Sequence, residues 1–281
     1  MKMRKLDFAD VIIVVVLVLL ICSGSVMAQP ASVAITPASI DTKVKAGASY
    51  TQSFTLSNST NERLRFRCSA NDMWFDEQNR RITTDAGTQP RSASLWIQFT
   101  PSEVIIEPHG SAVVKATITI PQIASGSFYT VPVFEAALVE KPLMQTVAQT
   151  TDSTASIGIR FRGLMMLTTE QGAEYNVEIM GGKVSPPTGT SELEVSLDIL
   201  NRGNAHAKVR GAFAIIDSAG KLAGRGTIDE KRLLPTQRNT IQSKWSGELR
   251  PGEYTAVVTL SYARVGMEPT SLVHEISFSV K

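Results

Sequence analysis

Apolar and polar side chains alternate most regularly in the segment from Thr154 to Leu167. One side of an extended chain carries three apolar residues there: Ile157, Ile159 and Phe161. The opposite side carries Gly158, Arg160 and Arg162. A repeat of two residues is typical of a half-buried β-strand. We therefore predict one strand that follows the long polar segment 145–153, closes a first module and leads directly into a second.

Two interpretations of this strand remain open. In the first, it is the last strand of a β-sandwich, and its apolar side belongs to the core. In the second, it is an edge strand that offers its apolar side chains and unpaired backbone groups to another protein.

Shorter alternating runs recur between turn residues from Ala31 onward. The strands expected in the first module are 32–36, 40–44, 50–56, 64–68, 94–100, 112–120 and 128–139. Pro37 suits a sheet edge or a kink at which the chain changes sheets. The polar segment 71–90 is expected to be irregular. Even turn spacing without helical periodicity indicates an immunoglobulin-like sandwich.

The second module repeats this pattern. Its expected strands are 175–180, 193–199, 205–216, 222–228, 240–245, 254–262 and 272–280. The segment 181–190 is rich in Gly and Pro, so we expect a loop there. Tyr254 follows a turn and leads a strand, as the residue of a tyrosine corner does. A plain core tyrosine fits the same position.

These patterns predict an all-β fold, with two immunoglobulin-like β-sandwich domains in tandem after a signal peptide. The expected boundaries are 1–28 for the signal peptide, 29–168 for the first domain and 169–281 for the second, which is immunoglobulin-like or fibronectin-like.

Three arginines alternate with apolar residues in the strand expected at 64–68: Arg63, Arg65 and Arg67. They lie on its polar side. A solvated face explains such a row, and an anion-binding site is the alternative.

The N-terminus reads as a secretory signal peptide. A basic head precedes an unbroken apolar run of twelve residues from Val11 to Cys22, and Ala28 is a suitable cleavage position. The run is short for a membrane span, which needs roughly 18 to 20 apolar residues. We therefore expect a periplasmic or secreted protein cleaved after Ala28. An uncleaved N-terminal anchor is the alternative.

Composition adds little about partners. The 281 residues are 43% hydrophobic and 19% charged, with a formal net charge of +2. This balance gives no reason to expect a nucleic-acid partner. Cleavage would leave Cys68 as the one cysteine, so the exported chain cannot form an internal disulfide. We expect Cys68 to be a buried, inert thiol.

Motifs for catalysis are few. The three histidines are scattered along the chain without metal-ligand spacing: His109, His206 and His274. Ser218 and Lys221 have Ser-x-x-Lys spacing, but they fall in an expected turn and not at the start of a helix. We therefore expect no enzyme, no metal and no small-molecule cofactor.

The first module resembles the N-terminal domain of periplasmic pilus (fimbrial) chaperones, the PapD-like family. The resemblance depends on Trp-Ile-Gln-Phe-Thr-Pro at 96–101, Ile-Glu-Pro-His-Gly at 106–110, the strand ending at Pro121, and Phe128-Tyr129. It also depends on the long polar loop before the alternating strand. The second module resembles generic immunoglobulin-like domains of bacterial secreted proteins.

The resemblance implies a role for each side of the alternating strand. Family members lend this strand to incomplete pilus subunits, so Ile157, Ile159 and Phe161 would contact the client. Arg162, or Arg160 in its place, would hold the client's C-terminal carboxylate. The family's second anchoring arginine would fall close to Ser39, and no arginine occurs between Ala31 and Thr60.

We therefore expect a periplasmic chaperone-like protein that binds secreted or pilus subunits by β-strand addition, with an outer-membrane usher as a further possible partner. The alternative is a structural or adhesive immunoglobulin-like protein of the cell envelope.

Overall fold

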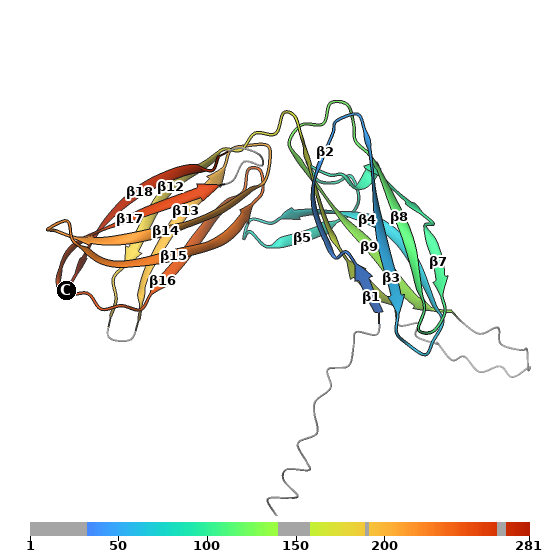
Figure 1. Cartoon of the computed structure of the whole chain (residues 1–281), viewed down its shortest axis with the longest axis horizontal. Helices are drawn as coiled ribbons and strands as arrows, with labels where there is room; N and C mark the ends of the chain where they lie inside the picture. The colour runs from blue at the N-terminus through green and yellow to red at the C-terminus, as the bar shows by residue number, and fades with distance from the viewer. Residues whose placement is uncertain (1–32, 140–157, 189–190, 263–267) are drawn as a thin grey trace, which may run out of the picture.

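The computed structural model describes residues 33–139, 158–188, 191–262 and 268–281. These residues form two β-sandwich lobes set at an angle to each other (Figure 1). In the described residues, no helix is long and apolar enough to span a membrane. The predicted signal peptide lies outside the described residues.

The first lobe is built from the strands that precede residue 170. They are β1 (Val33–Thr36), β2 (Ser39–Val44), β3 (Ser49–Asn58), β4 (Leu64–Phe75), β5 (Arg81–Thr84), β6 (Ile97–Thr100), β7 (Glu103–Ile106), β8 (Ser111–Thr119), β9 (Ser127–Leu138), β10 (Ile159–Arg162) and β11 (Leu164–Thr169). One sheet has the order β1-β3-β8-β6. The other has the order β2-β11-β9-β4-β5, with β7 added to β4 and β10 added to β9.

Apolar residues from both sheets form the core of this lobe. Phe54 of β3 and Phe134 of β9 are fully buried, and their ring centroids lie 5.1 Å apart. Each strand sends alternate side chains inward, so the predicted apolar positions meet between the sheets.

The second lobe contains the remaining strands. They are β12 (Val177–Ser185), β13 (Leu193–Asn201), β14 (Ala207–Asp217), β15 (Leu222–Leu233), β16 (Arg238–Trp245), β17 (Gly252–Tyr262) and β18 (Thr270–Val280). Their sheets have the orders β12-β13-β16 and β15-β14-β17-β18, with a separate core between them. The predicted all-β fold with two immunoglobulin-like sandwiches in tandem is confirmed.

Tyr254 forms a tyrosine corner. Its hydroxyl donates a hydrogen bond of 2.9 Å to the carbonyl oxygen of Arg250, four residues upstream. Tyr254→Phe should therefore lower the free energy of unfolding by about 1 kcal/mol, the usual net value of one hydrogen bond. Urea denaturation of the full chain measures this loss. Tyr262→Phe is the matched control, because the hydroxyl of Tyr262 forms no hydrogen bond with the described residues. If both variants lost the same free energy of unfolding, the hydrogen bond of Tyr254 would not stabilise the fold as proposed.

Three predicted segments differ from the structure. Residues 71–75 complete β4, and residues 72–75 pair with β5 in a hairpin, so 71–90 is not irregular throughout. Ser94–Trp96 is a 3-10 turn in which Leu95 is 75% exposed, and the strand begins only at Ile97. Gly181–Ser185 continues β12 after a register shift, and is not a loop.

Glycine at position 182 allows β12 to pack closely. A Cβ atom at Gly182 would lie 2.7 Å from Cδ2 of Leu197.

Candidate functional site

The alternating segment does not form one uninterrupted strand. It is divided at Gly163 into β10 and β11, and residues 154–157, including Ile157, lie outside the described residues. At the division, the Gly163 amide donates to the carbonyl of Pro132, and the Leu164 amide donates to that of Ala38. The two halves differ in their neighbours: β11 lies between β9 and β2, whereas β10 pairs with β9 and with no other described strand.

A change of sheet near Pro37 explains the open edge of β10. Before Pro37, β1 pairs with β3 in the opposite sheet; after it, β2 starts at Ser39 beside Leu164. This is the sheet-switching role that the sequence suggested for the proline. Because β2 starts beside Leu164 and runs parallel to β11 as far as Thr169, it covers β11 and does not extend along β10. The outer backbone edge of β10 therefore has no partner strand within the described residues.

The inner side of β10 agrees in part with each interpretation of this strand, because one of its residues belongs to the core and another is exposed. Phe161 lies opposite Phe134 and packs against the core while partly buried. Ile159 lies opposite Ala136 and remains 43% exposed. Phe161 thus anchors the strand to the core, whereas Ile159 remains partly exposed.

On the outer face of the sheet, side chains of alternating charge form a row across four strands, and the row ends at β10. We call this row the charge ladder, and its members are Glu103 of β7, Arg67 of β4, Glu135 of β9 and Arg160 of β10. Arg160 forms an ion pair with Glu135, and Arg67 lies 3.5 Å from Glu103. The predicted arginine row is therefore paired: Arg63 binds Glu107 at 2.7 Å, and Arg65 also contacts Glu103. The alternative of an anion site on this row is not supported.

Arg162 lies in a different environment from Arg160. The residues across from it are Val133 of β9 and, beyond that, Ser69 of β4. Its side chain is exposed, and no described residue forms an ion pair or hydrogen bond with it. Of the two arginines predicted as carboxylate anchors, Arg162 is the one with its charge uncompensated.

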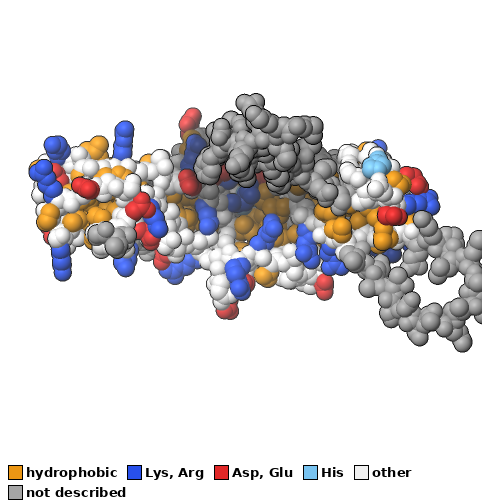
Figure 2. Space-filling view, turned by 90° about the horizontal axis from the view of Figure 1, so that it is seen from below, with side chains coloured by type: hydrophobic (Ala, Val, Ile, Leu, Met, Phe, Trp, Pro, Cys, Tyr) orange, Lys and Arg blue, Asp and Glu red, His pale blue; other side chains and the backbone are white. Residues whose placement is uncertain are grey.

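A pocket of about 270 Å³ opens between the lobes beside the start of β11. We call it the junction pocket. Its apolar lining comes from Met73, Trp74, Phe75, Leu164, Met166 and Leu234. Three cationic side chains also line it, Arg81, Lys231 and Arg232, whereas no carboxylate does. On the concave side of the molecule, hydrophobic side chains lie among Lys and Arg between the lobes (Figure 2).

Asp41 connects the two lobes through what we call the junction network. Its carboxylate lies 3.3 Å from Nε2 of His206, 3.1 Å from Nζ of Lys208 and 3.4 Å from a guanidinium nitrogen of Arg232. The hydrogen bond from His206 and the nearby positive charges hold the pKa of the Asp41 carboxyl well below its usual range, although burial opposes this shift. The backbone adds a second link, because the Ser127 amide donates to the carbonyl of Asn204.

Sequence reasoning did not find this network. His206 is only 7% exposed and lies in the second lobe, while Asp41 lies in β2 of the first. No local spacing connects two residues so far apart in the chain, and only the docking of the lobes brings them together.

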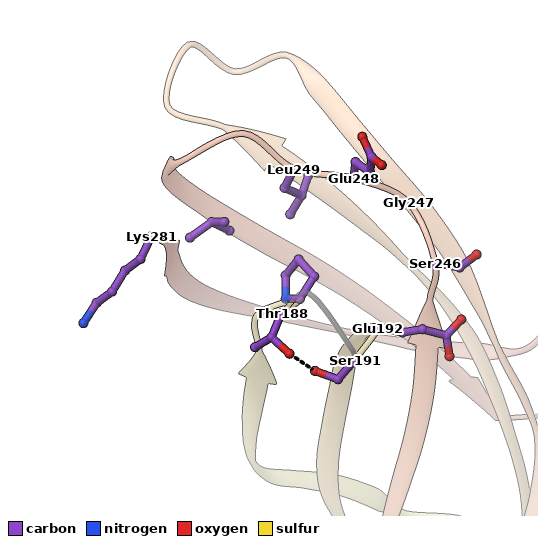
Figure 3. Close-up of a pocket in the computed structure, with 10 residues that line it drawn as sticks. Thr188, Ser191, Glu192, Ser246, Gly247, Glu248, Leu249 and Lys281 are labelled. Atoms are coloured by element: carbon purple, nitrogen blue, oxygen red, sulfur yellow. Dashed lines mark hydrogen bonds between the residues drawn. The ribbon is translucent and has the colours of Figure 1, made fainter.

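A cavity of about 570 Å³ lies at the far end of the second lobe. Its lining side chains do not converge: Glu192, Glu248 and Lys281 point in different directions, and the Thr188 and Ser191 hydroxyls bond each other (Figure 3). The charged and hydroxyl groups that line this cavity therefore do not form a binding or catalytic site.

Other candidate chemistry is absent from the described part of the chain. No cluster of three or more metal-ligating side chains occurs there. Burial raises the pKa of the Cys68 thiol to about 11, so this buried cysteine is unreactive at neutral pH. Ser218 and Lys221 lie at the turn between β14 and β15, as expected.

No family model matches the sequence, and no match was found among curated proteins. Several solved structures are similar. One is described as a chaperone and tip-adhesin complex of CFA/I fimbriae biogenesis, with 16% identity, a TM-score of 0.47, and coverage of 87% of this chain and 98% of that one. Another is the class 5 fimbriae chaperone CfaA, with 16% identity, a TM-score of 0.46, and coverage of 86% and 98%. A third is the Salmonella enterica SafA pilin with the SafB chaperone, with 12% identity, a TM-score of 0.39, and coverage of 90% and 98%.

Proposed function

We propose that this protein is a periplasmic chaperone that binds pilus or other secreted subunits by adding β10 to an incomplete sheet of the client. The observation that carries the proposal is the outer edge of β10, which has no partner among the described strands and lies next to the exposed Ile159. Main-chain hydrogen bonds along such an edge supply affinity, and alternate side chains supply specificity. The sequence resemblance of the first lobe to pilus chaperones supports this class of client. The role is binding, without bond-making chemistry.

Arg162 is the proposed anchor for the C-terminal carboxylate of the client. A guanidinium without a carboxylate partner is suited to a carboxylate that loses water at an interface. The strand β2 occupies the edge immediately beyond, from Leu164 onward. A client strand that ends at Arg162 must therefore lie beside residues 158–162, and it must run parallel to β10.

The junction pocket contains positive charge close to Arg162, whereas the start of β2 lacks the second anchoring arginine that the resemblance implies. Ser39 stands where the resemblance places a second anchoring arginine. Leu164, two residues after Arg162, lines the pocket that contains Arg81, Lys231 and Arg232. Arg232 already pairs with Asp41, so we propose that Arg81 and Lys231 take over the missing charge near the client's terminus.

Arg162→Ala should remove the preference for a free carboxylate. The probe is a synthetic nine-residue strand peptide with alternating apolar residues, prepared with a C-terminal carboxylate or a C-terminal amide. We expect wild type to bind the carboxylate form about tenfold more tightly, as for one hydrogen-bonded charge pair. Fluorescence polarisation measures both dissociation constants.

Arg225→Ala is the matched control, because Arg225 is exposed on β15 of the second lobe, without a described partner. It should keep the wild-type preference. A preference retained by Arg162→Ala would exclude Arg162 as the anchor.

A further inference from the structure

We infer that the client strand carries an acidic side chain beside Arg160, two residues before its C-terminal carboxylate. This inference depends on the proposed function and specifies the chemistry of its partner. It follows from the charge ladder, whose last member lies at the open edge of β10.

The outer face of these strands has excess positive charge. Four arginines lie on it, and two glutamates oppose them: Arg65, Arg67, Arg160 and Arg162 against Glu103 and Glu135. Glu135 lies between Arg67 and Arg160, while Glu103 contacts Arg65 and Arg67. A strand added to β10 therefore meets an edge that is short of carboxylates.

Arg160 retains capacity for a second partner. Its side chain is 56% exposed despite the ion pair with Glu135. A guanidinium has five N–H donors, and one carboxylate occupies at most two. A carboxylate on the added strand would extend the ladder by one further alternation, whereas a lysine would lie beside a like charge.

The position of this acidic residue follows from the period of the strand. Alternate residues of an added strand share a face. If the terminal residue lies beside Arg162 on the outer face, the residue two positions earlier lies beside Arg160. The intervening residue and the one before the acidic position face inward, beside Phe161 and Ile159, and should be apolar.

A peptide series tests this inference on the full chain. Three strand peptides with a free C-terminal carboxylate carry Glu, Ser or Lys two residues before the end and are otherwise identical. We expect wild type to bind the Glu peptide about fivefold more tightly than the Lys peptide, from the range of cross-strand charge pairs. The ratio should fall toward one in Arg160→Ser and reverse in Arg160→Glu.

Arg225→Glu is the control for a general change in charge, and it should keep the wild-type ratio. Circular dichroism confirms that each variant is folded. If wild type binds all three peptides within twofold, the inference is wrong and the proposed function stands. If wild type binds none of them, the proposed function fails as well.

Discussion

The Ile159→Asp variant should lose its client while the protein remains folded. Ile159 is 43% exposed in the unbound chain, so an aspartate there stays hydrated and the lobe keeps its core. In a complex formed by strand addition the same position is buried, and an unpaired carboxylate would lose its water. We expect affinity to fall about 100-fold or more. The measurement is co-purification with a pilus subunit of the same cell, together with peptide binding by fluorescence polarisation.

Val273→Asp provides the matched control. Val273 is 63% exposed on β18, an edge strand of the second lobe, and receives the same chemical change. It should bind the subunit as wild type does. Normal recovery of the subunit by Ile159→Asp would remove the physical basis of the proposed function. Phe161 is unsuitable for this test, because it packs against the core and its replacement would confound binding with stability.

Local patterns in the sequence were sufficient to place most strands and their inward faces. Phe54 and Phe66 lie at alternating positions of their strands and are buried as that alternation predicts. The hairpin at the end of β4 was missed because its polar residues resemble a loop. Asp72 is fully buried there, and it accepts a hydrogen bond from Ser92 Oγ at 2.5 Å and one from the Gln89 amide at 2.8 Å. Such satisfied buried polar groups have no signature in hydrophobic periodicity.

The candidate site was only partly predictable, because the sequence does not show the register in which β10 pairs with β9. Sequence alternation places Arg160 and Arg162 on one face, but it does not show which residue of β9 lies opposite each. The pairing of Arg160 with Glu135, and of Arg162 with Val133, distinguishes the compensated arginine from the uncompensated one. Likewise, the open edge depends on β1 pairing with β3 and not with β10. Such non-local pairings are set by the whole sandwich.

Asp41→Asn should loosen the junction between the lobes. The substitution keeps the size of the side chain and removes the charge shared by His206, Lys208 and Arg232. A fully buried pair broken in this way costs several kcal/mol, but the side chain of Asp41 is partly exposed, so we expect about 2 kcal/mol. Urea denaturation measures the loss, and small-angle X-ray scattering should show a broader distribution of distances between the lobes.

Because Asp41 is ionised in the junction network, we expect the stability of the junction to depend on pH. Folding lowers the pKa of Asp41, so its stabilisation is complete above the unfolded pKa of about 3.9 and is lost as pH falls further, toward the folded pKa. Wild type should therefore lose junction stability below about pH 4, whereas Asp41→Asn should lack this component of the acid response. Asp198→Asn is the control, because Asp198 pairs with Arg238 inside the second lobe and its pKa is also lowered, first by the Thr240 hydroxyl. If Asp41→Asn matches this control in the distribution of distances between the lobes, the junction network does not fix the lobes. In that case other links hold the lobes together, such as the hydrogen bonds from the Ser127 amide to the Asn204 carbonyl and from Gln237 Nε2 to Asn79 Oδ1.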